Sequence, residues 1–174
     1  MVTVSGDHQA FLDLALPHLD AVWNVARHSA SPGIEPDDLV QETFLRAFAA
    51  FRRFRGGDPR SWLVSICLNA ARDHLRRARR RPKEVRALDD SMPDDTDVGA
   101  EVMRSVDRDT IERALAGLPE AQRTAILLMD VTGLTAQQTA DVLGSPRGTI
   151  LARVHRGRRK LAELLREKKA IDDV

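Results

Sequence analysis

The chain has 174 residues, of which 43% are hydrophobic and 4% are aromatic, and its formal net charge is +1. This length gives one ordinary domain or two small ones, and the aliphatic composition favours helices. The single cysteine, Cys67, excludes an internal disulfide and a zinc site of several cysteines, and it fits a reducing cytoplasm. No secretory signal is recognisable, and the longest apolar runs, such as 125–129, are too short to span a bilayer. We therefore expect a cytoplasmic protein without a membrane span.

The charges fall into four blocks of alternating sign. Residues 1–50 hold 2 Lys or Arg against 7 Asp or Glu, whereas residues 51–86 hold 12 against 3. Residues 87–112 then hold 2 Lys or Arg against 9 Asp or Glu, and residues 113–174 hold 11 Lys or Arg against 7 Asp or Glu. One basic block is typical of a solvated helix, but two that each follow a helical pattern favour two nucleic-acid-facing surfaces.

The amino-terminal half predicts three helices. The spacing of apolar residues over 8–28 is helical, with Pro17 as a kink or a break. After a loop at 31–36, Asp37 is expected to cap a helix over DLVQETFLRAFAAFRRF. The glycines and proline of RGGDPR interrupt this pattern, and a third helix is expected from Ser61 to the residue before Pro82.

The carboxy-terminal half predicts a separate helical domain. Residues 84–100 are acidic, lack sustained periodicity and are expected to form a flexible linker. Helices follow over 103–116 and from Leu118-Pro119-Glu120 onward. The expected fold is all-α, with domains at 1–83 and 101–174 joined by that linker.

A helix-turn-helix motif is expected at the end of the chain. Thr135 and Gln138 have the spacing of a capping box before AQQTADVL, and Gly144-Ser145-Pro146 forms the turn before a helix that runs to about Lys169. Stepping at about 100° per residue puts Ile150, Val154, Gly157, Leu161 and Leu164 on the inward side of that helix.

The outward side of the same helix is the candidate DNA surface. In this motif the amino-terminal residues of the second helix meet base edges, while flanking arginines bind phosphate. We expect Leu151, Ala152 and His155 to face bases, and the first two offer only methyl packing. Arg147, Arg153 and Arg156 are expected to bind phosphate, with Thr149 in the first turn and Arg159 further along the same side. Each arginine taken alone is better explained as a solvated charge, whereas His155 fits a plain surface histidine and a base contact equally well.

Three longer stretches follow one another along the chain, DLVQETFLRAF, FRRFRGGDPRSWLVSICLNAARDHLRRARRR and LPEAQRTAILLMDVTGLTAQQTADVLGSPRGTILARVHRGRRKL. Taken together and in this order, they closely resemble the extracytoplasmic-function (ECF, group IV) sigma factors of the sigma-seventy family. The resemblance implies sigma region two, a linker and sigma region four. It further implies binding to core RNA polymerase at the beta-prime clamp helices and the beta flap, promoter recognition and melting, and an anti-sigma partner.

The resemblance also implies roles for particular residues. The helix that docks on the polymerase would contribute Asp38, Gln41, Glu42, Phe44, Leu45 and Arg46. Residues for the minus-ten element would be Phe54, Arg55, Gly56, Gly57, Asp58, Trp62, Asn69, Arg72, Arg76 and Arg77. The outward side of the last helix would read the minus-thirty-five element. Phe44 and Trp62 also fit a core role, and Asn69 also fits a surface amide.

Two features depart from the family pattern. Leu151 and Ala152 stand where many members carry a basic residue and a serine, so a typical minus-thirty-five sequence is not transferred to this chain. Cys67 stands where a small apolar residue is usual, and we interpret it as a buried small hydrophobe rather than a redox sensor.

Two other functions remain open from the residues alone. A stand-alone helix-turn-helix regulator would need a dimerisation helix instead of a polymerase-docking domain. A small helical enzyme is disfavoured, because the five histidines show no metal-ligand spacing and no glycine-rich phosphate loop occurs. We therefore expect no catalytic residue, no metal and no cofactor.

Overall fold

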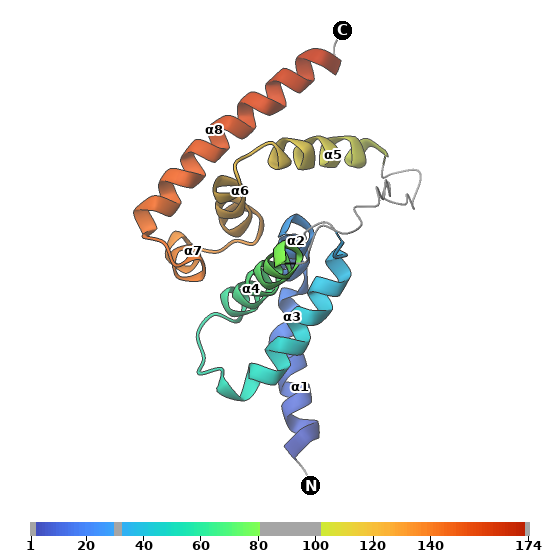
Figure 1. Ribbon diagram of the computed structural model, residues 1–174, viewed down its shortest axis with the longest axis vertical. Coiled ribbons are helices and arrows are strands. Elements are labelled where there is room, and N and C mark those ends of the chain that lie inside the picture. The colour runs from blue at the N-terminus through green and yellow to red at the C-terminus, as the bar shows by residue number, and fades with distance from the viewer. Residues whose placement is uncertain (1–2, 30–32, 81–101, 173–174) are drawn as a thin grey trace. The chain divides into compact units, whose positions relative to one another are not determined.

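The computed structural model describes residues 3–29, 33–80 and 102–172, with side chains described for 6–29, 33–80 and 109–166 (Figure 1). Within those residues every regular element is a helix, as the sequence predicts. The predicted linker at 84–100 and both predicted domain boundaries lie outside the described residues. The boundaries therefore stay predictions.

By its internal contacts the described chain divides into two units. The first contains the helices up to residue 80 together with 127–151, and the second contains 102–126 and 152–172. Each unit is described separately below.

The amino-terminal helix is broken where the sequence predicts it. Helix α1 (Thr3–Ala15) passes into a 3-10 turn, η1 (Leu16–His18), before α2 (Leu19–Ser29) begins. Pro17 lies inside η1 and has no N–H for a helical hydrogen bond, which accounts for the interruption. The predicted single segment is therefore two helices with one 3-10 turn between them.

Two predicted helix starts differ from the structure. Helix α3 (Pro36–Ala50) has Glu35 at its N-cap, with Pro36 in the first turn, so the prediction that Asp37 caps it was wrong. A proline is favoured there because its fixed φ suits the helix and its missing N–H would be unpaired anyway. Helix α4 (Pro59–Arg80) begins at Pro59 rather than Ser61 for the same reason.

The core of the first unit is aliphatic. Its fully buried side chains include Val22 and Val25 of α2, Leu39 of α3, and Leu63 and Val64 of α4. These three helices pack against one another (Figure 1), and the same cluster includes Leu128 and Leu134. The buried stripe of α4 fixes which of its sides remains exposed.

Cys67 lies in this core, as predicted for a small hydrophobe. It is fully buried, and its Sγ lies 3.9 Å from the Val22 carbonyl oxygen. Burial raises the pKa of its thiol to about 11, so the thiolate is scarce at neutral pH. The site is that of an inert structural thiol.

The carboxy-terminal elements follow the predicted order. Helix α5 (Val102–Ala116) precedes α6 (Glu120–Ile126), which continues as a π-helical turn, η3 (Leu127–Val131). Helices α7 (Ala136–Leu143) and α8 (Arg147–Asp172) complete the chain. In the second unit Gly157 of α8 is buried, and a Cβ there would lie 2.6 Å from Ile126 Cδ1. A Cβ at this position would therefore force the buried Ile126 side chain, at least, to shift.

Candidate polymerase- and DNA-binding surfaces

Helix α3 presents a mixed apolar and polar surface. Asp38 and Gln41 are exposed, and Leu45 is 64% exposed. Phe44 is half-buried and packs on the core, where its ring meets the edge of the Phe11 ring at a centroid distance of 6.3 Å. The structure thus places Leu45 outward, while Phe44 is engaged mainly inside the unit.

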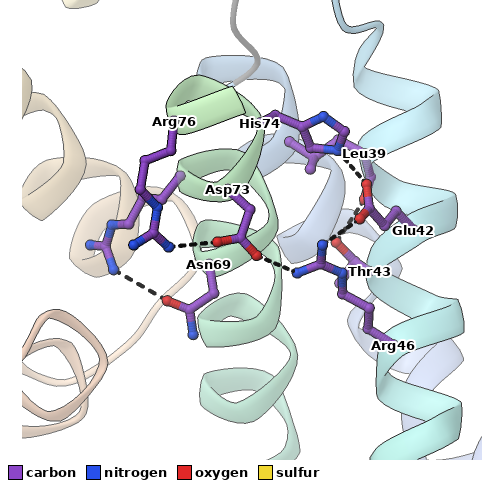
Figure 2. Close-up of polar contacts among 9 residues, drawn as sticks. Leu39, Glu42, Thr43, Arg46, Asn69, Asp73, His74 and Arg76 are labelled. Atoms are coloured by element: carbon purple, nitrogen blue, oxygen red, sulfur yellow. Dashed lines mark hydrogen bonds and ion pairs between the residues drawn. The ribbon is translucent and has the colours of Figure 1, made fainter. Parts of the chain in front are cut away.

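The other two predicted docking residues, Glu42 and Arg46, belong to an ionic network between α3 and α4 (Figure 2). Arg46 Nη2 donates to Glu42 Oε1 at 2.5 Å along α3, and Arg46 Nη1 donates to Asp73 Oδ2 of α4 at 2.9 Å. Asp73 Oδ1 in turn accepts from Arg76 Nη2 at 2.5 Å, and His74 Nε2 contacts Glu42 Oε2. The network joins predicted polymerase-docking residues to a predicted DNA-binding residue.

Both carboxylates of this network are stabilised in their charged form. Hydrogen bonds from Arg46 and Arg76 hold the pKa of Asp73 below its ordinary value. Burial by itself would raise the pKa of Glu42, but hydrogen bonds from His74 and Arg46 together with their charges lower it overall. Asp73 and Glu42 are therefore both charged near neutral pH.

The loop between α3 and α4 places an aromatic pair at the surface of the first unit. The chain leaves α3 through a 3-10 turn, η2 (Phe51–Arg53), and the Phe54 and Trp62 rings then lie with centroids 4.6 Å apart and tilted by 32°. Phe54, Asp58 and Trp62 line an open pocket. Trp62 is half-buried, so the structure gives it both a packing contact and a face toward this pocket.

The same loop depends on two glycines and an aspartate. Gly56 and Gly57 have φ of 90° and 101°, a conformation that other residues rarely adopt. Asp58 accepts hydrogen bonds from the backbone N–H of Ser61 at 2.8 Å and from Ser61 Oγ at 2.5 Å. Burial would raise the pKa of Asp58, yet these hydrogen bonds lower it. Asp58 therefore fixes the start of α4, while exposed Arg55 is available to a ligand.

The exposed side of α4 carries the predicted minus-ten residues. Asn69 is exposed, and its Oδ1 lies 3.4 Å from Arg72 Nη1. Exposed arginines continue to the end of the helix at Arg72, Arg76, Arg77, Arg79 and Arg80. The loop, the aromatic pair, Asn69 and this basic stretch follow one another along the chain from residue 54 to residue 80.

The helix-turn-helix motif has the predicted local geometry. Thr135 accepts a hydrogen bond from the Gln138 N–H at 3.2 Å, and the Gln138 side chain accepts one from the Thr135 N–H at 2.8 Å. This capping box begins α7, and Gly144 ends it with φ of 59° in the left-handed region. Gly144 allows the sharp turn after which α8 begins at Arg147.

Helix α8 has the predicted inward and outward sides. Ile150, Val154 and Gly157 are buried, whereas Leu161 and Leu164 are half-buried. On the other side Leu151 is 40% exposed. The exposed arginines and histidine there are Arg147, His155, Arg156 and Arg159, while Thr149, Ala152 and Arg153 are half-buried. The outward side of α8 therefore combines one exposed apolar side chain, Leu151, with exposed arginines.

Sequence reasoning missed Asp73 and His74. The spacing of Asp73 and Arg76, three apart on a helix, could have indicated one ion pair, as could Glu42 and Arg46, four apart. The pairs from α3 to α4 have no sequence signal, because their partners are 27 and 32 residues apart.

Comparison with known proteins decides what these surfaces belong to. The family model "Sigma-70 region 2" matches residues 14–81, and the model "Sigma-70, region 4" matches residues 108–161. The ECF RNA polymerase sigma factor SigM of Mycobacterium tuberculosis is 35% identical over 163 residues, which cover 93% of this chain and 80% of that protein. The chain belongs to the ECF sigma factors of the sigma-70 family.

Two further relatives agree with this assignment. The RNA polymerase sigma-H factor of Pseudomonas aeruginosa is 30% identical to this sigma factor, with coverage of 93% of this chain and 91% of that one. A solved structure of the sigma factor RpoE with the anti-sigma factor NepR from Bartonella quintana has a TM-score of 0.69 and 28% identity. That match covers 92% of this chain and 97% of that chain. The sequence-based recognition and the all-α fold are therefore confirmed.

Among the residues described, no helix is long and apolar enough to cross a membrane. Within the same part of the chain, no group of three or more His, Cys, Asp or Glu side chains is placed to hold a metal ion.

Proposed function

We propose that this ECF sigma factor binds core RNA polymerase through α3, contacts the minus-ten element with the 54–58 loop and α4, and contacts the minus-thirty-five element with α8. The observation that supports it most is the match of both sigma regions in order, on a chain whose exposed basic residues follow the matched DNA-binding elements. Polymerase and promoter lie in the bacterial cytoplasm, so we place the protein there. We assign the chemical step to the polymerase rather than to this chain.

Docking on the polymerase would rest on the exposed side of α3. An exposed leucine offers a partner apolar surface to bury, and an arginine held by ion pairs beside it offers a positive charge in a restricted position. Leu45 supplies the first and Arg46 the second, with Asp38 and Gln41 at the polar edge. The beta-prime clamp helices would be the partner of this side.

Recognition of the minus-ten element would rest on an unstacked base. Removing a base from the stack costs about a few kcal/mol, which aromatic packing and hydrogen bonds to the base can offset. The Phe54–Trp62 pair and the Asn69 amide supply these contacts, and Gly56 and Gly57 let the backbone come close. Arg72, Arg76 and Arg77 would bind the adjoining phosphates.

Recognition of the minus-thirty-five element would combine methyl packing with phosphate contacts. Leu151 and Ala152 cannot donate or accept a hydrogen bond, so they would select thymine methyl groups in the major groove. His155 can contact a base edge, while Arg147, Arg156 and Arg159 would bind phosphate. The element should therefore depend on thymine at the positions that Leu151 and Ala152 meet.

An anti-sigma factor is the proposed regulatory partner. The similar RpoE protein of Bartonella quintana was crystallised with its anti-sigma factor NepR. Leu45 and Leu151 are exposed, and a protein inhibitor that covered them would block the surfaces proposed to meet the polymerase and the promoter.

Retention on core polymerase in the absence of DNA tests the proposal against the alternative of a stand-alone regulator. A sigma factor co-elutes with purified core polymerase at equal stoichiometry and elutes alone as a monomer. A stand-alone helix-turn-helix regulator elutes as a dimer and passes core polymerase without binding. The second result would contradict the proposed function.

A further inference from the structure

Asp73 occupies a central place in the network between α3 and α4 (Figure 2). Each of its carboxylate oxygens accepts from a different arginine, Oδ2 from Arg46 on α3 and Oδ1 from Arg76 on its own helix. Its side chain keeps 33% of its surface exposed, so it acts at the edge of the unit rather than in the core. One acidic residue therefore touches both the proposed docking helix and the proposed DNA-binding helix.

Asp73 restricts the conformation of Arg46. The Arg46 guanidinium donates one hydrogen bond to Glu42 of the same helix and another to Asp73 of α4. Its side chain remains 32% exposed, so a partner can still reach it. An arginine whose rotamer is fixed beforehand loses less conformational freedom on binding, which favours the complex.

Asp73 also affects the basic stretch of α4. Arg76 is 67% exposed and lies among the arginines proposed to bind phosphate, but its Nη2 is 2.5 Å from Asp73 Oδ1. A carboxylate at this distance offsets part of the field that draws a phosphate to the helix. Affinity for any DNA sequence should be lower than the arginines alone would give.

We propose that Asp73 is a positioning residue with two opposite effects: it raises affinity for core polymerase through Arg46 and lowers the affinity of the free protein for non-specific DNA through Arg76. The inference rests on the proposed function, because it assumes that α3 docks on the polymerase. It adds a residue to which the comparisons and the sequence pattern give no role. Such a residue would keep the free factor off bulk DNA and favour entry to promoters as part of the holoenzyme.

The test uses the full chain with Asp73→Asn, which removes the charge and keeps the shape. Affinity for core polymerase is measured by fluorescence anisotropy, and affinity of the free protein for a random-sequence duplex is measured at several salt concentrations. We expect core affinity to fall about three- to tenfold, because the ion pair with Arg46 is lost, and DNA affinity to rise about two- to fivefold, because the ion pair with Arg76 is lost. A variant that merely loosens the fold would lose affinity for both partners.

Asp20→Asn is the matched control. Asp20 is an exposed residue in the first turn of α2, and this substitution changes the net charge by the same amount. It should leave core affinity unchanged and raise DNA affinity less than Asp73→Asn does. Circular dichroism at the assay temperature verifies that both variants are folded.

A double-mutant cycle tests whether Asp73 acts through Arg46. Arg46→Ala alone should weaken core binding, and adding Asp73→Asn to it should weaken core binding no further. Additive losses would show that Asp73 contacts the polymerase itself or acts elsewhere, and this would overturn the proposal.

The proposal is wrong if core affinity does not fall in Asp73→Asn, or if its DNA affinity does not exceed that of Asp20→Asn. Failure of the proposed function gives a different result, since the unmodified chain would then not bind core polymerase at all.

Discussion

Arg46 of α3 and Asp73 of α4 form an ion pair across two helices, with Arg46 Nη1 2.9 Å from Asp73 Oδ2. They are 27 residues apart in sequence, and each also has a partner on its own helix, Glu42 for Arg46 and Arg76 for Asp73. The pair therefore connects two local ion pairs into one network. In an ECF sigma factor this connection lies between the helix proposed to meet the polymerase and the helix proposed to meet the promoter.

The acid sensitivity of folding should depend on this network. Asp73 and Glu42 have lowered pKa values in the folded chain, so their stabilisation is complete above their unfolded values, near 3.8 and 4.5. It is lost as the pH falls below those values and through the folded ones. Thermal unfolding followed from pH 6 to pH 3 should show a steeper loss for the unmodified chain than for Asp73→Asn. The two stabilities should converge at the acid end, and parallel curves would contradict this account.

Leu45→Ala should weaken polymerase binding without weakening the fold. The side chain is 64% exposed in the free protein, so its truncation removes little internal packing. Burial of a leucine against a partner contributes about 1.5 kcal/mol, which corresponds to roughly tenfold in affinity for core polymerase.

Leu16→Ala is the control for that experiment, because Leu16 is 52% exposed but lies in η1 rather than on α3. It should leave affinity for core polymerase unchanged. Equal effects of the two substitutions would argue against α3 as the docking helix.

Gly157→Ala should destabilise the carboxy-terminal helices. The added Cβ would lie 2.6 Å from Ile126 Cδ1 and 3.2 Å from Gln122 Cβ, and Ile126 is itself buried. Overpacking of this kind costs about 1–3 kcal/mol, against a gain in helix propensity of about 1 kcal/mol. We expect a lower unfolding temperature.

Gly148→Ala on the same helix provides the comparison. A Cβ at Gly148 meets nothing within 4 Å, so only the propensity gain remains and the unfolding temperature should stay level or rise. If both alanine variants are equally stable, the close contact of α8 with α6 is not a constraint on the fold.

Arg156→Gln and Leu151→Ala should affect promoter binding differently. Removal of a phosphate contact at Arg156 should weaken binding to all duplexes alike and reduce the salt slope by about 0.9. Removal of the Leu151 methyl groups should instead reduce the preference for thymine at one position of the minus-thirty-five element. Binding to matched duplexes, with and without that thymine, across a salt series separates the two. A change of base preference in Arg156→Gln would contradict the assignment of roles.

The parts of the fold set by neighbouring residues could be predicted from the sequence. The capping box at Thr135, the break at Pro17 and the inward stripe of α8 each depend on spacings within a few residues, and each is confirmed. The starts of α3 and α4 were each placed two residues late, because the preference of proline for the first helical turn was not weighed against the aspartate and serine nearby.

The site could be predicted only in part. The matched motifs indicated which helices to consider, but which of their side chains are free depends on packing between helices. Glu42 and Arg46 were predicted to face a partner, and that stays a prediction, but their contacts with α4 were not foreseen. Asp73 was not considered because nothing near it in the sequence identifies its partner on α3. Asp58 likewise accepts a hydrogen bond from the Ser61 N–H at the start of α4, and its place in a loop predicted to bind DNA does not indicate this contact.

Run-off transcription with purified core polymerase on a promoter library tests the central claim most directly. If this chain directs the polymerase, initiation should require the chain. The templates that are used should share one minus-ten and one minus-thirty-five element, and transcription should start downstream of these elements. Leu45→Ala should lower the yield on every template, whereas Leu151→Ala should change which templates are used. Core polymerase that gives the same transcripts with and without the chain would contradict the account.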